Sequence, residues 1–236
     1  MVLVALGVGL VLVVGGAVVV GDHAAAQAQD VAGADLERTW RDGVDPTADA
    51  ASPQGAPVAR LRIPALGADR TTVLLEGTGE DVLARGPGHY SGTPFPGAPG
   101  NAAVAGHRVS RGAPFDGLGD LASCDAVVVE TRDELMTYRV LPFGDETVGW
   151  AEGKGSVPAC AGVAVPTGDY AGLVGRTIVT PDRVDVLAPV PGHPEVRPQN
   201  PLRLLTLTTC HPRFSARERM VIHAVLVETS PAPTGA

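Results

Sequence analysis

Short runs of β-branched residues, broken repeatedly by glycine and proline, extend over most of the chain from Val58 onward. The sequence has 30 glycines and 21 prolines among 236 residues, which favours many turns and few long helices. Two β-rich runs flank residues 131–133, a pattern typical of a hairpin. The chain is therefore expected to fold as an all-β domain, either a closed barrel or a sandwich, with short helices.

The first 21 residues differ from the rest because they contain no charged residue before Asp22. About 20 apolar residues suffice to cross a bilayer as a helix. No Lys or Arg precedes this run, so the positive-inside rule does not orient it. An Ala-x-Ala pattern within residues 24–29 leaves cleavage of a signal peptide open. We expect residues 1–21 to form an uncleaved transmembrane anchor, with the rest of the chain exported.

Three segments follow the predicted anchor. Residues 22–57 are rich in Ala, Asp, Gly and Pro without a sustained period, which predicts a disordered linker. Residues 58–229 carry the β-rich runs and form the predicted folded domain, although the glycine-rich region 147–175 fits no single element type. Residues 230–236 are proline-rich and are predicted to be a disordered tail.

Charge and motif content exclude several classes of function. The net charge of −8 argues against a nucleic-acid-binding protein, because no basic patch is evident. The sequence has no glycine-rich phosphate loop and no CxxC or HExxH metal motif. The loop residues Asp116, Asp120 and Asp182 lack the spacing of a calcium site. We therefore predict neither a cofactor nor a metal ion.

The chain has three cysteines, a number that suits an exported protein with one disulfide and one free thiol. If a pair forms, we expect Cys124 to pair with Cys160, which leaves Cys210 free. The alternative, three reduced thiols, stays open at this point.

Cys210 follows an alternating run, so Thr206, Thr208 and Cys210 share one face of a predicted strand. A cysteine at the end of a strand is accessible yet held by a rigid scaffold, which suits a nucleophile. A neighbouring cation favours the thiolate form. Arg213 lies in the following loop, and Arg217 and Arg219 have the same strand parity, so spacing does not choose between those two.

A cysteine nucleophile also needs an acid or base, and His89 and His107 are the candidates among the six histidines. His107 ends a strand-like run of small residues and follows Gly106, which permits close approach of the backbone. A buried structural role for His107 remains equally compatible with this pattern. The other four histidines are assigned to a linker, a turn, a strand interior and a position adjacent to the cysteine: His23, His193, His223 and His211.

Three blocks of sequence resemble one family. "TLTTC" at residues 206–210 resembles the T-L-x-T-C motif of sortases, the cysteine transpeptidases of Gram-positive surfaces. "GNAAVAGHR" at residues 100–108 resembles their histidine segment, and "CHPRFSARERMVIHA" at residues 210–224 is most similar to the class E group of high-GC actinobacteria. The resemblance covers roughly residues 58–227. It implies an eight-stranded β-barrel and an N-terminal membrane anchor. It also implies Cys210 as nucleophile, His107 as acid/base and Arg219 as the arginine of the site.

The resemblance further implies a function for the exported domain. Such an enzyme cleaves the C-terminal sorting signal of a secreted protein through a thioacyl intermediate and joins the protein to an amine of a cell-wall precursor. The expected signal is Leu-Ala-x-Thr-Gly, or the related Leu-Pro-x-Thr-Gly. We add Tyr90, Thr209 and His211 as candidate substrate-binding residues, with Tyr90 at the second signal position. The predicted location is the cell membrane, with a single span and an extracellular catalytic domain.

Two other hypotheses about the function compete with the sortase hypothesis. L,D-transpeptidases also use Cys and His on a β scaffold, but in them the two residues are close together in an S/T-H-G-C motif, which this sequence lacks. A membrane-tethered domain that binds a wall polymer or protein without catalysis would keep Cys210 as a buried thiol.

Overall fold

The computed structural model describes residues 2–48, 52–68 and 70–233, and for residues 2–20 it describes the backbone alone. Two helices and nine strands form the regular structure: α1 (Val2–Arg41), β1 (Pro57–Arg62), β2 (Thr71–Glu76), α2 (Glu80–Leu83), β3 (Gly88–His89), β4 (Gly100–Ala105), β5 (Ala126–Glu130), β6 (Glu134–Val140), β7 (Arg176–Val179), β8 (Arg203–His211) and β9 (Glu218–Pro231). Several single turns of 3-10 helix lie in the connections.

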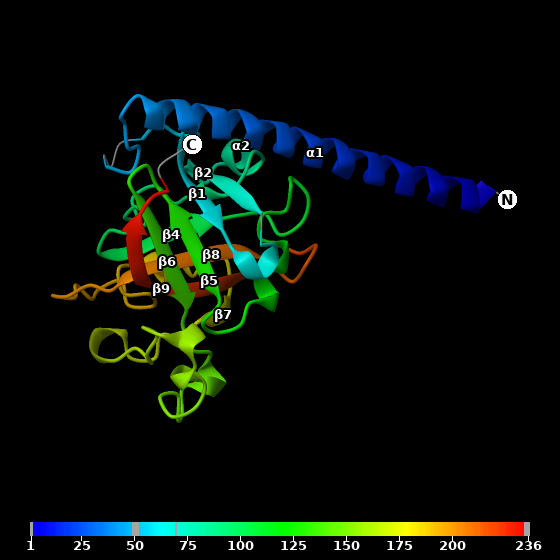
Figure 1. Ribbon diagram of the computed structural model, residues 1–236. Coiled ribbons are helices and arrows are strands. Elements are labelled where there is room, and N and C mark those ends of the chain that lie inside the picture. The colour runs from blue at the N-terminus through cyan, green and yellow to red at the C-terminus, as the bar shows by residue number, and fades with distance from the viewer. Residues whose placement is uncertain (1, 49–51, 69, 234–236) are drawn as a thin grey trace.

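Eight of these strands close into a barrel (Figure 1). The sheet runs in the order β6-β5-β1-β2-β3-β4-β8-β9, and pairing between β6 and β9 closes it. The parallel β4–β8 pair connects segments about a hundred residues apart in the sequence. The ninth strand, β7, pairs with the first part of β9. This part of β9 pairs with β8 along its other edge. The predicted eight-stranded closed barrel is thus confirmed, with one additional strand on its side.

Aliphatic side chains from alternate positions of the strands fill the barrel. On β8 these are Leu205 and Leu207, and on β9 they are Met220, Ile222 and Ala224. Because side chains alternate along a strand, the residues between them point out of the barrel. This parity decides which face of β8 carries Cys210.

The glycine-rich region 147–175 consists of turns that pack into a second, smaller core outside the barrel. A disulfide between Cys124 and Cys160, with a Cα–Cα distance of 5.0 Å, ties this region to the segment before β5. The expected pairing is confirmed, and Cys210 is the free cysteine. A closed loop of this length is worth about 3–4 kcal/mol of stability in the chain-entropy account.

The predicted disordered linker is wrong for residues 22–41, which continue α1. Ala25, Ala32 and Leu36 are buried at positions that share one helix face. This face packs over β2 and α2 against a small cluster that includes Val73 and Leu75. Figure 1 shows α1 crossing one side of the barrel and projecting beyond it towards its N-terminal end.

The predicted disordered tail is also partly wrong. Strand β9 continues to Pro231, where it pairs with Glu134 of β6, and Ala232 donates a backbone hydrogen bond to Asp133. This pairing protects an edge of β6 that would otherwise be open. Residues 234–236 of the predicted tail lie outside the described residues.

In the part of the chain with described side chains, no helix combines the length and apolar character that a membrane span requires. The predicted anchor, residues 1–21, falls almost entirely outside that part.

Candidate active site

The outer face of β4, β8 and β9 carries the candidate site. Leu205 and Leu207 lie in the barrel core, so Thr206, Thr208 and Cys210 point outward. The free thiol of Cys210 is therefore at the outer surface of the barrel wall, at the end of β8, and its side chain is half-buried.

Arg219 is the direct cross-strand partner of Cys210 in the antiparallel β8–β9 pair. Paired residues on one face of such a ladder have neighbouring side chains. Spacing alone left Arg217 and Arg219 tied. In the structure Arg217 is exposed in the loop before β9, whereas Arg219 is the residue paired with Cys210. The Arg219 guanidinium donates to the carbonyls of Ala216 and Glu218, both at 3.1 Å.

His107 lies one residue beyond the point where β4 and β8 stop exchanging backbone hydrogen bonds. Ala105 pairs with Thr208, and the backbone N–H of Gly106 donates to the Thr208 carbonyl at 3.1 Å. Continuing this parallel register places His107 level with Cys210. Arg219 on β9, Cys210 on β8 and His107, two residues after the end of β4, are thus at matching register positions at one rim of the barrel, a set we call the rim row.

The imidazole of His107 is half-buried, and its pKa is lowered from the ordinary 6.5. Desolvation is the main cause, the positive charge of Arg111 adds to it, and Glu80 opposes it. His107 is therefore neutral at neutral pH and can accept a proton from a thiol or an amine.

Tyr90 reaches the same face from the residue after β3. Its backbone N–H donates to the Ala103 carbonyl at 2.9 Å, and its hydroxyl lies 3.0 Å from the Thr208 hydroxyl. Thr208 is two residues before Cys210 on the same side of β8. Tyr90 therefore lies on the outer face of β8, against the residue two positions before Cys210.

The other two sequence-predicted contacts lie differently. Thr209 is buried, and its hydroxyl donates to the Gly106 carbonyl at 2.7 Å, so it points away from the outer face and holds the end of β4. His211 is half-buried, and its Nδ1 accepts a hydrogen bond from the Arg108 guanidinium at 2.8 Å. The same Arg108 nitrogen lies 3.4 Å from the Cys210 carbonyl. Sequence reasoning missed Arg108, although its position directly after the histidine was a usable signal.

A second set of cross-strand neighbours lies further down the same outer face, and we call it the inner row: Ala103, Thr206 and His223. The Thr206 hydroxyl donates to Asn101 Oδ1 at 2.6 Å and lies 2.8 Å from His223 Nδ1. Because its one proton goes to Asn101, the Thr206 oxygen accepts from His223, which fixes Nδ1–H on that ring.

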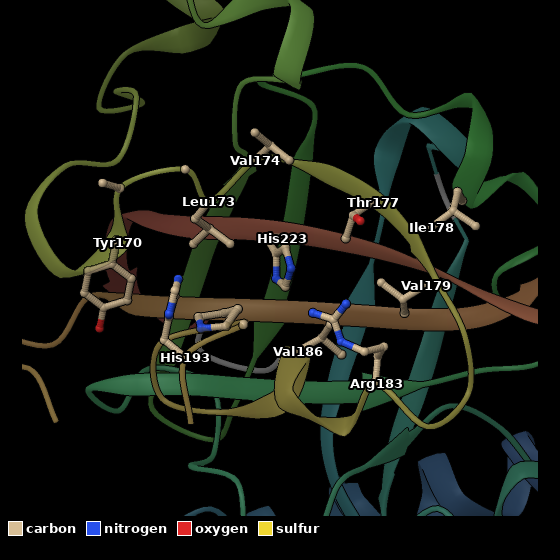
Figure 2. Close-up of a pocket in the computed structure, with 14 residues that line it drawn as sticks. Tyr170, Leu173, Val174, Thr177, Ile178, Val179, Arg183, Val186, His193 and His223 are labelled. Atoms are coloured by element: carbon tan, nitrogen blue, oxygen red, sulfur yellow. The ribbon is translucent and has the colours of Figure 1, made fainter. Parts of the chain in front are cut away.

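A pocket of about 490 Å³ opens over the inner row. Figure 2 shows His223 projecting from β9 into this pocket, with β7 on one side and Val186 and His193 from the connection to β8 on another. Val179 also lines the pocket and is the cross-strand partner of Arg219, so the pocket adjoins the rim row.

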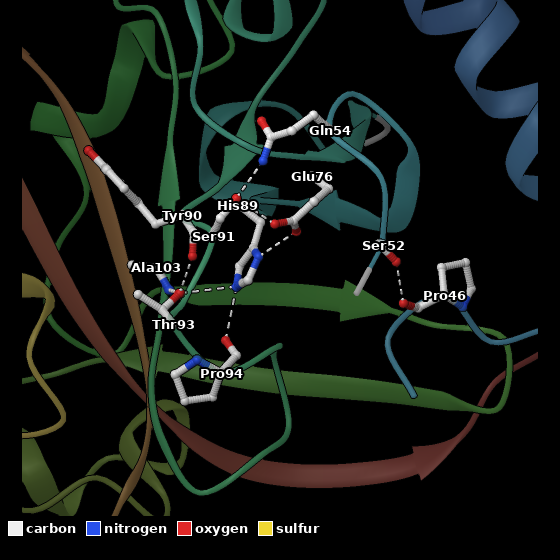
Figure 3. Close-up of polar contacts among 10 residues, drawn as sticks. All are labelled: Pro46, Ser52, Gln54, Glu76, His89, Tyr90, Ser91, Thr93, Pro94 and Ala103. Atoms are coloured by element: carbon white, nitrogen blue, oxygen red, sulfur yellow. Dashed lines mark hydrogen bonds and ion pairs between the residues drawn. The ribbon is translucent and has the colours of Figure 1, made fainter. Parts of the chain in front are cut away.

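His89, the other candidate from the sequence, is a buried structural residue. Its Nδ1 lies 2.7 Å from the Glu76 carboxylate, and its Nε2 lies 3.0 Å from the Pro94 carbonyl. Figure 3 shows this network continuing through Ser91 and Thr93. Thr93 also donates to the Tyr90 carbonyl at 2.8 Å, so the network supports the segment that carries Tyr90.

Comparisons with known proteins agree with this geometry. Residues 61–227 match the family model described as Sortase domain. The chain belongs to the sortase family. It is 31% identical over 220 residues to sortase SrtE1 of Streptomyces coelicolor, covering 90% of this chain and 51% of that relative. The chain thus spans about half the length of this curated relative.

Solved structures extend the likeness to the fold. The SrtF sortase from Corynebacterium diphtheriae is 38% identical, with a TM-score of 0.66 over 82% of this chain and 95% of that one. Sortase E1 from Streptomyces coelicolor, solved with a tripeptide in the active site, is 30% identical, with a TM-score of 0.55 over 75% and 91%. The resemblance to class E sortases expected from the motifs is confirmed.

Proposed function

We propose that this chain is a membrane-anchored cysteine transpeptidase that cleaves a C-terminal sorting signal and joins the released protein to a cell-wall amine. The observation that carries the proposal is the rim row, in which a free thiol has an arginine as its cross-strand partner and a neutral histidine just beyond the end of the neighbouring strand. Membership of the sortase family supports the same chemistry.

The first half-reaction forms the thioacyl-enzyme. Neutral His107 takes the proton of the Cys210 thiol, and the sulfur attacks the carbonyl carbon of the scissile Thr-Gly bond. The carbon–nitrogen bond breaks as His107 returns that proton to the leaving nitrogen. Arg219 stabilises the negative charge on the carbonyl oxygen, a contribution of about 3–4 kcal/mol for one well-placed donor.

The second half-reaction transfers the acyl group. A cell-wall amine attacks the thioester carbon, and His107 accepts the proton that the amine loses. The carbon–sulfur bond breaks, and the thiol of Cys210 is regenerated by that proton. Water in place of the amine gives hydrolysis by the same route.

The groove for the signal is assigned to the outer face between Tyr90 and the pocket over the inner row. The pocket adjoins the rim row, and aliphatic side chains line part of it, among them Leu173, Val174 and Val186, which suits the leucine of an extended peptide. Tyr90 beside Thr208 is our candidate for reading the second signal position, Ala or Pro. Residues 1–21 are proposed as the membrane anchor, since they contain no charge before Asp22.

The test compares single substitutions with fluorogenic Leu-Ala-x-Thr-Gly and Leu-Pro-x-Thr-Gly peptides, with and without an amine acceptor. Cys210→Ala should abolish cleavage and transfer without changing the unfolding temperature. Arg219→Lys should lower kcat/KM by about 10²-fold or more, because lysine lacks the forked donors of arginine.

Arg217→Lys is the matched control, because Arg217 is exposed two residues before Arg219, in the loop that precedes β9, and should tolerate the change. Turnover retained by Cys210→Ala would refute the proposal. Equal losses in the two arginine variants would refute the role assigned to Arg219.

A further inference from the structure

The loop after His107 has an unusual backbone. Four consecutive residues, 110–113, have positive φ angles: 57° at Ser110, 53° at Arg111, 73° at Gly112 and 39° at Ala113. Three of these are not glycine, and such residues rarely adopt this conformation unless their surroundings hold them there. Because the loop begins directly after His107, whatever holds the loop also fixes that residue's backbone.

Two contacts from outside the loop hold it. The Asp22 carboxylate of α1 accepts a hydrogen bond from the backbone N–H of Gly112 at 2.9 Å. On the other side of the same residue, the Arg70 guanidinium donates to the carbonyls of Gly112 at 2.6 Å and Ala113 at 3.1 Å. Within the loop, Phe115 N–H donates to the His107 carbonyl at 3.1 Å, which links the clamped segment to the histidine.

Helix α1 is itself held firmly in place. The Gln29 side chain exchanges hydrogen bonds with the backbone of Val73, at 2.6 Å and 3.1 Å, and donates to the Arg85 carbonyl at 2.9 Å. Ala32 and Leu36 are buried one and two turns further along the helix. A Cβ on Gly112 would lie 3.6 Å from the Ala25 side chain, so the loop also packs against the helix.

We propose that α1 is a working part of the active site, with Asp22 as a positioning residue that fixes loop 108–114 and thereby the placement of His107 and Arg111. The proposal rests on the function assigned to His107 above. It also gives the N-terminal segment a task besides anchoring, because the contact lies directly after the uncharged run of residues 1–21.

The charges around His107 allow the effect of the Asp22–Gly112 contact to be measured as a change in the pKa of His107. Arg111 comes from the loop itself and lowers the pKa of His107, Glu80 of α2 opposes it, and Cys210 and Arg219 lie on the neighbouring strands. A loop released from Asp22 carries Arg111 away from its present position. The pKa of His107 should then rise towards its ordinary value.

The experiment uses the full chain in lipid nanodiscs and compares Asp22→Ala with Asp22→Asn. The alanine variant should lower kcat for a sorting peptide about tenfold at an unchanged KM, since it loses the acceptor that orients the loop. The asparagine variant should keep most activity, because its amide oxygen still accepts from Gly112. Asp35→Ala is the matched control, because the Asp35 carboxylate pairs with Arg38 on the exposed side of the same helix.

The second readout, NMR titration of the His107 ring, does not depend on turnover. We expect a raised pKa of His107 in Asp22→Ala, and wild-type titration in Asp22→Asn and Asp35→Ala. An unchanged kcat and an unchanged titration in Asp22→Ala would overturn the inference while leaving the proposed function intact. Turnover by Cys210→Ala would instead overturn the proposed function, and the titration would still report on the Asp22–Gly112 contact.

Discussion

The rim row and the inner row lie on the same outer face of β8, four residues apart, or about 13 Å along the strand. Each contains a histidine beside a side chain that ends in sulfur or oxygen. In the inner row the partners are Thr206 and His223, and in the rim row they are Cys210 and His107. The two rows nevertheless have opposite characters.

The Thr206 and His223 side chains of the inner row belong to a hydrogen-bond network that extends to Asn101 of β4. Asn101 donates to the carbonyls of Val186 and Ala188, Thr206 donates to Asn101, and His223 donates to Thr206. His223 is buried, and desolvation lowers its pKa to about 4. Such a network specifies a unique arrangement of the β4–β8–β9 wall and contributes to stability.

In the rim row the histidine and the thiol are half-buried, and within the described part of the chain no hydrogen bond occupies the His107 ring. Its donor and acceptor capacity is available to a substrate. The comparison teaches that two histidines on one barrel wall differ in accessibility and in hydrogen bonding at Nδ1, which is why we propose His107, and not His223, as the acid/base group.

The largest expected effect contrasts the two histidines. His107→Ala should lower kcat/KM about 10²- to 10⁴-fold, since it removes the acid/base group. His223→Gln should lower kcat less than tenfold, because that ring lies in the pocket assigned to the signal (Figure 2) and outside the rim row, so its loss should act mainly on KM. Steady-state kinetics with the same peptide tests both variants. Similar losses of kcat in the two would break the distinction between the rows.

The next effect concerns acid stability. Below pH 6.5 the unfolded chain binds a proton at His223, whereas the folded chain binds it only near pH 4. Stability should therefore fall as the pH drops through this window, by up to about 3 kcal/mol from this residue, with no effect above it.

Chemical denaturation at several pH values measures this, and the difference between wild type and His223→Gln isolates the histidine from titrating carboxylates. Parallel curves for the two proteins between pH 6.5 and 4 would mean that burial of His223 does not govern acid stability.

A smaller effect is expected for Thr206→Val, which leaves Asn101 Oδ1 and His223 Nδ1–H without their partner. The free energy of unfolding should fall by about 1–3 kcal/mol, the cost of stranded buried polar groups. Thr71→Val is the control, because Thr71 is exposed on β2. A loss of activity larger than the loss of stability would place the inner row within the catalytic machinery.

Local patterns in the sequence predicted much of the scaffold and the free state of Cys210. Strand alternation placed Thr208 and Cys210 on one face, and the β-rich runs around residues 131–133 gave the β5–β6 hairpin. Spacing alone left open the role of His107 and the choice between Arg217 and Arg219, because cross-strand register determines which side chains lie opposite Cys210. That register depends on pairing between segments as distant as β4 and β8.

The missed helix has a different cause. Residues 22–41 are rich in alanine and charge, and their buried side chains are mostly small, as at Ala25 and Ala32. Small side chains give a weak apolar stripe, so the packing surface on β2 was not visible in the sequence. The contact between Asp22 and Gly112 links residues 90 positions apart. It was not predicted because the helix that carries Asp22 was not predicted.

The central claim is that the thiol of Cys210 carries the acyl group of the substrate. Intact-mass and peptide-mapping spectrometry of the full chain, quenched in acid during turnover of a sorting peptide, tests it directly. We predict a mass increase equal to the peptide up to its threonine, located on Cys210, absent from Cys210→Ala and released by an amine. Turnover without any adduct on Cys210, or an adduct at another residue, would contradict the account.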